Sequence, residues 1–297
     1  MAVLGPTASG KSDVAVAVAS AVGGEIISVD SMQVYRGMDI GTAKPSATLR
    51  AEVPHHMIDV VGPEDAYSVA EFQRDGVPIV DRSAREAMTV IVGGSGLHFR
   101  AVVDPLEFPP TDAAVRAVVE AGDLSELLAE LLAADPDAGS HVDLGNPRRV
   151  RRAVEILRLT AATPSSRAGT PRAHMVREYE PRIPLVAIGL DPGAAIAGRV
   201  EARFDAMLEE GLLDEVAGLV GSLGPTASQA VGYKELVPVV RRETTIAEAR
   251  QAAIAATMAL VKRQRTYFRR DPRIRWLPWH DDPATRTAMA TAALGEM

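Results

Sequence analysis

The sequence has no cysteine among its 297 residues, and aromatic residues make up only 4% of it. The absence of cysteine excludes disulfides, cysteine nucleophiles, zinc fingers and iron–sulfur clusters, and it fits a reducing cytoplasm. No uncharged apolar run approaches the length that crosses a bilayer, and the amino terminus lacks a basic region followed by an apolar stretch. We therefore expect a soluble, cytoplasmic protein without a membrane partner.

Lysine is also scarce, because only Lys11, Lys44, Lys234 and Lys262 are present and arginine supplies the remaining positive charge. The net charge is −7, which argues at first against a nucleic-acid partner. Phosphate contacts are made by local patches, however, so the distribution of the arginines matters more than the sum of the charges.

Short apolar segments alternate with helical patterns in the first third of the chain. Each of these segments ends in a glycine-rich or acidic turn, which predicts a parallel α/β sheet with ligands at the carboxyl ends of its strands. The first segment is short, so we expect the native amino terminus to be longer. The predicted strands are 3–4, 26–29 and 89–92, with a helix over 11–22 that Gly23 and Gly24 end.

The pattern changes after Pro109 and Pro110. Leucines recur at helical spacing between residues 111 and 163, and a stretch rich in Pro, Ser, Gly and Thr follows up to residue 172, which we expect to be a mobile loop. An apolar strand over 183–190 and a long helix up to Glu210 then return to the α/β pattern. We predict an α/β core formed by 1–109 and 181–297, interrupted by a helical insertion domain over 110–180.

A phosphate-binding loop lies between the first strand and the first helix. Its glycines allow the backbone N–H groups to surround phosphate oxygens, and the following helix adds its positive amino-terminal end. Lysine would neutralise the terminal phosphate, and the serine hydroxyl would be a ligand of Mg²⁺. The motif points to a diphosphate or a triphosphate without distinguishing them, and a chance match is the alternative. The loop consists of Gly5, Pro6, Thr7, Ala8, Ser9, Gly10, Lys11 and Ser12.

Asp30 ends the second predicted strand, next to this loop. A carboxylate at that place can face a bound ligand. The residue could bind the metal ion, act as a general base, or only cap the following turn, and the position alone does not separate these roles.

Two clusters of basic residues follow later in the chain. Arginines beside aromatic residues suit phosphate contact and base stacking, whereas ion pairs on solvated helix faces are the alternative, because Glu155 and Asp271 lie nearby in the sequence. Adjacent His55 and His56 point in different directions on any regular element, so we expect them to be structural rather than metal ligands. The first cluster is Arg148, Arg149, Arg151 and Arg152; the second is Lys262, Arg263, Arg265, Arg269, Arg270, Arg273 and Arg275, interleaved with Tyr267, Phe268 and Trp276.

The phosphate loop followed by Ser-Val-Asp-Ser-Met-Gln-Val-Tyr-Arg-Gly-Met-Asp-Ile-Gly-Thr-Ala-Lys-Pro, at 28–45, resembles the tRNA dimethylallyltransferase (isopentenyltransferase) family. The resemblance continues in order through nearly the whole chain, so it is more specific than any single motif. The further matching segments are 54–59, 67–72, 92–97, 146–155, 211–216, 229–236 and 263–269.

The resemblance implies a P-loop nucleoside-triphosphate-hydrolase-like fold. It also implies a monomeric prenyltransferase that moves a dimethylallyl group from dimethylallyl diphosphate to the N6 amine of the adenosine next to the tRNA anticodon, releasing diphosphate. It makes Asp30 the general base, Thr7, Lys11 and Arg203 the other catalytic residues, and Mg²⁺ the cofactor, with Ser12 as its ligand. The residues that the resemblance assigns to tRNA contact are Asp30, Ser31, Met32, Gln33, Ser95, Arg116, Arg148, Arg149, Arg151 and Arg152.

The chain departs from the family at Ser95, where threonine is usual, and at His98, where tyrosine is usual. Serine retains the hydroxyl, and we assign no chemistry to His98. Three other functions share some of these features: a small-molecule kinase, a prenyltransferase that acts on free AMP, and an RNA-binding protein with a vestigial loop. The two basic clusters favour a large polyanionic acceptor, and the intact Gly-Lys-Ser together with Asp30 favours an enzyme.

Overall fold

In the computed structural model, which describes residues 1–86, 88–170 and 178–295, six parallel strands form one sheet in the order β3-β2-β4-β1-β5-β6. β1 is central and pairs with β4 and β5. The predicted α/β fold class is therefore confirmed, and the ends of β1, β2 and β4 lie at one edge of the sheet. The strands are β1 Ala2–Leu4, β2 Glu25–Ser28, β3 His55–His56, β4 Thr89–Gly93, β5 Ala187–Gly189 and β6 Ile274–Trp276.

The chain divides into a larger unit, Met1–Asp104 with Pro181–Met297, and a smaller unit, Pro105–Glu180. The sequence predicts the first boundary after residue 109, later than in this division. Within the smaller unit, Arg152 donates hydrogen bonds to the carbonyl oxygens of Pro109, at 2.8 Å, and Pro110, at 3.1 Å.

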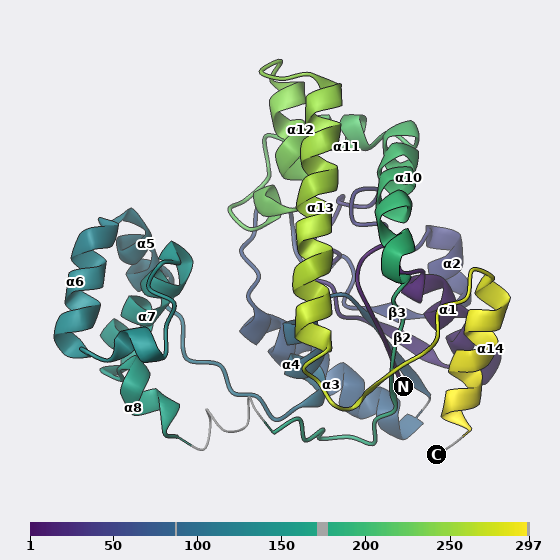
Figure 1. Cartoon of the computed structure of the whole chain (residues 1–297), viewed down its shortest axis with the longest axis horizontal. Coiled ribbons are helices and arrows are strands. Elements are labelled where there is room, and N and C mark those ends of the chain that lie inside the picture. Colours follow the sequence, from purple (N-terminus) through teal and green to yellow (C-terminus); the bar gives the residue numbers. More distant parts are fainter. Residues whose placement is uncertain (87, 171–177, 296–297) are drawn as a thin grey trace. The chain divides into compact units, whose positions relative to one another are not determined.

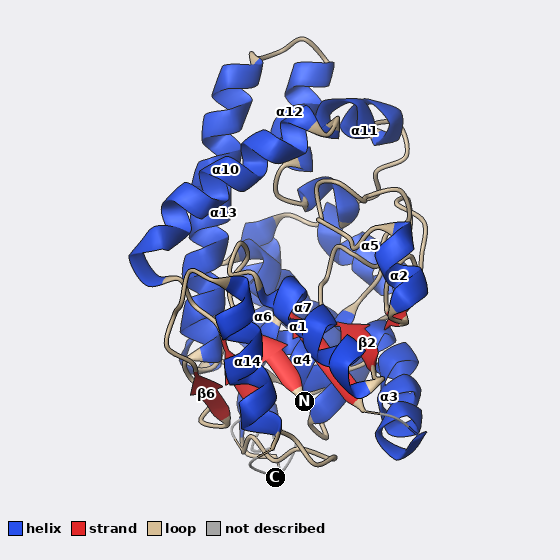
Figure 2. Cartoon of the chain, turned by 90° about the vertical axis from the view of Figure 1, so that its right-hand side faces the viewer, coloured by secondary structure: helices blue, strands red, loops and turns tan. Residues whose placement is uncertain are grey.

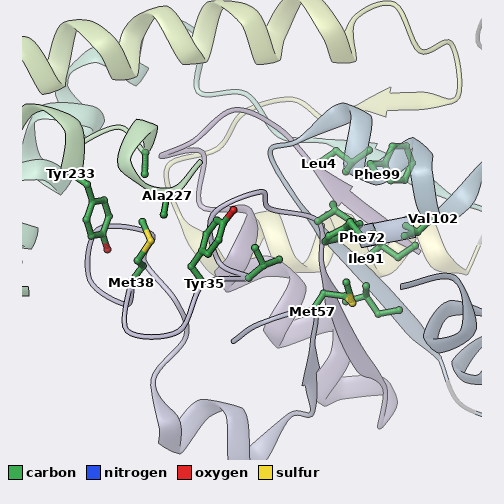
Figure 3. Packing of buried hydrophobic residues seen from close by; sticks show 14 of the residues in the cluster. Leu4, Tyr35, Met38, Met57, Phe72, Ile91, Phe99, Val102, Ala227 and Tyr233 are labelled. Carbon is green, nitrogen blue, oxygen red and sulfur yellow. The ribbon is translucent and has the colours of Figure 1, made fainter. Parts of the chain in front are cut away.

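Side chains alternate between the two faces of the sheet, so each face has its own core. Ala2 and Leu4 of β1 pack in the cluster that contains Phe72 and Phe99, part of which Figure 3 shows. Val3 packs on the opposite face, where the first and last helices of the chain meet each other. The covering helices are α3 Val69–Glu86 and α4 Gly96–Val103 on one face, and α1 Lys11–Val22 and α14 Pro283–Leu294 on the other.

Four further helices of the larger unit gather beyond one end of the strands (Figures 1 and 2). The longest of them starts at a capping box, in which the Thr245 side chain accepts from the N–H of Glu248 and the Glu248 carboxylate accepts from the N–H of Thr245. These helices are α10 Ile196–Glu209, α11 Leu212–Leu219, α12 Tyr233–Val240 and α13 Ile246–Phe268; α2 Ala47–Glu52 and the 3-10 turns η2 Gly193–Ala195 and η3 Ala227–Gln229 complete the unit.

The smaller unit is helical and has a core of its own, formed around Leu127, Leu131, Val150 and Val154. An acidic or amide side chain caps the start of each of its three longer helices, as the sequence favours. The elements are α5 Ala113–Ala121, α6 Leu124–Ala134, η1 Ala138–Ser140, α7 Pro147–Thr160 and α8 Pro164–Ala168.

Two local predictions were wrong. The strand expected over 183–190 extends only over Ala187–Gly189, because its neighbour β1 offers just three residues for pairing. The start of the expected loop is the short helix α8, which the Thr163 side chain caps and which Ser165 ties to Asp135. Residues 171–172 of that expected loop lie outside the described residues. Along the described chain, none of the helices combines the length and the apolar character that crossing a membrane requires.

Candidate functional site at the carboxyl ends of the strands

The phosphate loop connects β1 to α1 in a conformation that its two glycines permit. Gly10 has a φ of 74°, in the left-handed region that favours glycine. At Gly5, a Cβ atom would lie 2.2 Å from the carbonyl oxygen of Leu190, so only glycine fits. Ala8 has a φ of 61°, an uncommon conformation for a residue with a side chain. The loop thus contains a strained alanine that its surroundings must hold.

Lys11 starts α1, and its ammonium group donates a hydrogen bond to the carbonyl oxygen of Pro6 at 3.1 Å. Burial and the nearby Arg203 guanidinium lower the pKa of Lys11 to about 8, while Asp30 acts in the opposite direction. Burial likewise lowers the pKa of Arg203. The two cations are thus partly desolvated side by side, which disfavours their charged forms until an anion binds.

Asp30 follows β2 and caps a turn through one of its oxygens. Its Oδ1 accepts hydrogen bonds from the N–H groups of Met32, at 2.8 Å, and Gln33, at 3.4 Å. The capping alternative is therefore correct for one oxygen. Its Oδ2 has no protein hydrogen bond within the described ranges, and the residue lines a cavity. One carboxylate can thus hold the turn and still accept a proton.

One cavity of about 510 Å³ brings the predicted catalytic residues together. Thr7, Lys11, Asp30 and Arg203 all line it, although Arg203 comes from α10, far along the sequence. Apolar side chains form another part of its lining. The apolar lining includes Met32, Val92, Val200, Phe204, Met207, Leu212 and Leu260.

A loop after Asp30 forms another wall of the cavity and is anchored from α11. The Glu215 carboxylate accepts hydrogen bonds from the N–H groups of Asp39, Ile40 and Gly41, at 2.9, 2.8 and 3.1 Å, and from the Tyr233 hydroxyl at 2.5 Å. From the inner side, the Gln33 amide donates to the carbonyl oxygens of Thr42 and Ala43. Neither anchor was predicted from the sequence.

Gln264 of α13 is a further site residue that the sequence did not single out. Its Oε1 accepts a hydrogen bond from the N–H of Thr7 at 2.9 Å, and both Gln264 and Arg263 line the cavity. A Cβ atom at Gly94 would lie 2.4 Å from the Gln264 amide nitrogen, so glycine leaves room for this contact. Gln264 lies in segment 263–269, one of those that carry the family resemblance. That resemblance was the available signal, but it assigned no role to Gln264.

Comparison with known proteins identifies the family. Residues 33–271 match the family described as IPP transferase, and residues 1–55 match the one described as isopentenyl transferase. The chain belongs to the IPP transferase family. A tRNA dimethylallyltransferase of Salinispora arenicola is 44% identical over 289 residues, which cover 93% of this chain and 81% of that relative. The predicted family is thereby confirmed.

Solved structures of similar proteins have the same fold. The tRNA isopentenylpyrophosphate transferase of Bacillus halodurans matches with a TM-score of 0.71 and 35% identity, over 99% of this chain and 95% of that one. A eukaryotic dimethylallyltransferase acting on tRNA matches with a TM-score of 0.77, over 99% of this chain and 79% of that one. Its identity is 22%, so this likeness concerns the fold alone.

The residues predicted to contact tRNA fall into three groups. Asp30, Ser31, Met32 and Gln33 line the cavity. Ser95 precedes α4, and its hydroxyl lies 2.6 Å from Nδ1 of His98, whose pKa burial lowers to about 4. His98 also packs edge-on against Phe72, so the structure gives it a packing role. The third group lies in the smaller unit and consists of Arg116, Arg148, Arg149, Arg151 and Arg152.

Ion pairs occupy part of both basic clusters. In the smaller unit, the buried Glu155 binds Arg152 at 2.9 Å and Arg116 at 3.3 Å, and Glu120 lies 3.7 Å from Arg151. Arg148 and Arg149 are exposed and have no carboxylate partner among the residues that the structure describes. Of the five arginines of this unit that are predicted to contact tRNA, the ion-pair alternative thus accounts for three and leaves two available to a ligand.

In the second cluster, Asp191 binds Arg265 and Asp271 binds Arg273, at 2.5 and 2.7 Å. Lys262, Arg263 and Arg270 remain exposed on and after α13. The two histidines are structural, as expected: His56 binds the Glu25 carboxylate at 2.9 Å, and His55 lies 2.6 Å from the carbonyl oxygen of Val53.

Oxygen groups near the start of α1 suit the predicted Mg²⁺. Ser12 and Asp13 line the cavity beside Lys11, and hydroxyl and carboxylate oxygens are the donors that Mg²⁺ prefers. Within the described ranges, no three His, Asp or Glu side chains form a cluster that could hold a metal ion. Since Mg²⁺ is often held by few protein oxygens together with substrate phosphates, this arrangement fits an ion that binds with a diphosphate.

Proposed function

We propose that this chain transfers a dimethylallyl group from dimethylallyl diphosphate to the N6 amine of the adenosine next to the anticodon in tRNA, releasing diphosphate. The relative from Salinispora arenicola is a tRNA dimethylallyltransferase. The observation that carries the assignment is the single cavity lined by Thr7, Lys11, Asp30 and Arg203. This cavity combines cations that suit a phosphate group, a carboxylate and several apolar side chains.

The donor diphosphate would lie on the phosphate loop. Its negative charges would be met by loop N–H groups, by the start of α1, and by Lys11 and Arg203. Ser12 would hold Mg²⁺, which supplies charge stabilisation for the leaving diphosphate when it is bound. The apolar side chains of Phe204, Met207 and Leu212 offer the prenyl tail a water-poor surface.

In the reaction, the N6 nitrogen forms a bond to the allylic carbon as the bond from that carbon to the diphosphate oxygen breaks. The electron pair of the broken bond leaves with diphosphate, where the cations stabilise it. The nitrogen gives up a proton, and the free Oδ2 of Asp30, which lines this cavity, can accept it. Asp30 is held for this task by its own turn, through Oδ1.

The apolar part of the lining favours this proposal over a small-molecule kinase. A kinase would need room for a nucleoside and a polar acceptor beside the transferred phosphate, whereas Phe204, Met207 and Leu212 give this cavity apolar contact surface. For the acceptor, the exposed Arg148 and Arg149 favour tRNA over free AMP, since a polyanion offers such arginines many phosphates and AMP offers one.

The deciding experiment incubates the protein with Mg²⁺, dimethylallyl diphosphate and unmodified tRNA, and measures adenosine modification by mass spectrometry. Parallel reactions replace tRNA with AMP, or the prenyl donor with ATP. We expect one prenyl group on one tRNA adenosine and none on AMP. Phosphoryl transfer from ATP without prenylation would reject the proposal, and prenylation of AMP alone would reject tRNA as the acceptor.

A further inference from the structure

The ring of Trp279, near the carboxyl terminus, packs against two arginines that lie beside the phosphate loop. The guanidinium carbon of Arg286 lies 4.6 Å from the ring centroid of Trp279, and that of Arg199 lies 5.2 Å from it. Both are within the range of cation–π attraction. The three residues come from α14, the segment before it, and α10, so the stack joins the end of the chain to the helix that carries Arg203.

The stack is in direct contact with the phosphate loop. Nε of Arg199 donates a hydrogen bond to the carbonyl oxygen of Ala8 at 2.7 Å. A methyl group on Gly10 would lie 3.2 Å from Nη2 of Arg286 and 3.5 Å from Nη2 of Arg199. Arg199 therefore binds Ala8, and both guanidinium groups lie beside Gly10; the backbones of Ala8 and Gly10 are in the left-handed region.

Burial and hydrogen bonds hold the Arg286 side chain in position. Its residue is 2% exposed, and its Nη1 donates to the carbonyl oxygens of His280, at 2.7 Å, and Asp281, at 2.9 Å. Its Nε is buried without a hydrogen-bond partner. Burying a guanidinium group that no carboxylate balances is costly, so the position calls for a compensating role.

The positive charges of Arg199 and Arg286 add to those of the cations that line the cavity. Arg199 lies close enough to Arg203 to disfavour its charged form, and Arg203 acts on Lys11 in the same way. In the part of the chain that the structure describes, none of Lys11, Arg199, Arg203 and Arg286 forms an ion pair with a carboxylate, whereas Arg265 binds Asp191 at 2.5 Å. An anion of high charge density bound on the loop would balance this set.

We propose that Arg199, Trp279 and Arg286 are positioning residues of the phosphate loop. The stack fixes the strained Ala8 carbonyl and supports Gly10 from behind, so that the loop N–H groups already point at the diphosphate before it binds. Its two cations add to the field that attracts the diphosphate. This inference rests on the proposed function for the identity of the ligand, but not for the existence of an anion site on the loop.

The test compares folded variants by calorimetric titration with inorganic diphosphate at fixed Mg²⁺, and by steady-state kinetics. Trp279→Ala removes the ring, Trp279→Phe retains an aromatic face, and Arg286→Gln removes one charge. The matched control is Arg250→Gln, because Arg250 joins α13 to Asp205 of α10 at 2.6 Å without touching the loop. Since Trp279→Ala leaves all charges in place, its effect separates loop positioning from net charge.

We expect Trp279→Ala and Arg286→Gln to raise the Kd for diphosphate and the KM for dimethylallyl diphosphate about 3- to 10-fold, the range of one cation–π contact. The KM for tRNA should stay unchanged, Trp279→Phe should show an intermediate effect, and Arg250→Gln should behave as wild type. If Arg286→Gln does not fold, the two Trp279 variants decide.

Two results would overturn the inference: an unchanged Kd for diphosphate in folded Trp279→Ala, or an equal rise in the KM of both substrates. If the wild type binds diphosphate but prenylates no tRNA, and the variants still lose diphosphate affinity, then the proposed function fails while the positioning role stands.

Discussion

The cations of the two units differ in what balances them. Around the phosphate loop of the larger unit, Lys11 and Arg203 are desolvated, and no described carboxylate forms an ion pair with either. In the smaller unit, Arg152 and Arg116 share the buried carboxylate of Glu155, while Arg148 stands exposed in water.

This difference indicates two kinds of anion recognition. Desolvated cations without partners gain strongly from one small, highly charged ligand that fits between them. Exposed arginines gain little from any single contact, and they act through the release of counterions from a polyanion. The larger unit is thus suited to hold a diphosphate, and the exposed arginines of the smaller unit are suited to a nucleic-acid backbone.

Removal of a desolvated cation should have the largest effect on catalysis. Lys11→Ala should lower kcat for prenyl transfer by about a hundred- to a thousandfold, as for other groups that stabilise a leaving charge. Lys234→Ala, on the exposed surface of α12, is the control and should retain full activity. Near-normal turnover of a folded Lys11→Ala protein would place the diphosphate elsewhere.

Asp30 is the proposed general base and lines the same cavity as these cations. Asp30→Asn keeps an oxygen that can accept from the N–H of Met32, but the amide cannot take a proton. We expect single-turnover prenyl transfer to fall about a hundredfold, with unchanged melting and near-normal binding of diphosphate and tRNA. If turnover survives, Asp30 is only the cap of its turn.

Two double variants distinguish the exposed arginines of the smaller unit from those that form ion pairs. Arg148→Gln with Arg149→Gln should weaken tRNA binding about tenfold and reduce the slope of log K against log salt by about one for each arginine that touches a phosphate. Their affinity for dimethylallyl diphosphate should not change.

The matched pair, Arg151→Gln with Arg152→Gln, removes ion-pair partners instead, including one from the buried Glu155. We expect a lower melting temperature, because the buried Glu155 carboxylate loses the closer of its two arginine partners and keeps only Arg116. Equal loss of tRNA affinity in both double variants, without any change in melting, would mean that the paired arginines also contact tRNA.

The smallest expected effect is that of pH. Lys11 has a folded pKa of about 8, below its ordinary value of 10.5, so its charge is present at lower pH and is lost as the pH rises through 8. We expect kcat/KM for dimethylallyl diphosphate to fall about fourfold between about pH 7 and about pH 8.5. The value of kcat should stay flat further into alkaline pH, since bound diphosphate favours charged Lys11. A flat kcat/KM over this range would contradict the assignment.

The parts of the site that could be predicted are those in which neighbouring residues determine both the shape and the chemistry. The phosphate loop is one, because its glycines, lysine and helix start are contiguous. Asp30 is another, because the end of a strand determines its place. The position of Arg203 came only from the family resemblance, and the structure confirms that it lines the cavity.

Contacts between distant segments could not be predicted in this way. The bond from Thr7 to Gln264 joins residues 257 positions apart, and nothing in either segment indicates its partner. The same holds for Trp279, whose sequence neighbours do not reveal that its ring packs against Arg199 and Arg286. The predicted length of β5 was wrong for a related reason. The extent of this strand is determined by its partner β1 rather than by its own apolar residues.

Glu215 has a consequence for how this sequence can change. Its carboxylate holds three successive N–H groups, of Asp39, Ile40 and Gly41, together with the Tyr233 hydroxyl. A Cβ atom at Gly41 would lie 2.4 Å from the Tyr233 ring, and Tyr233 lies in the buried core with Met38 (Figure 3). Residues 39–41, Glu215 and Tyr233 should therefore change together in evolution. A larger residue at position 41 should be tolerated only with a smaller one at 233, and a chimaera between homologues should exchange all three segments together.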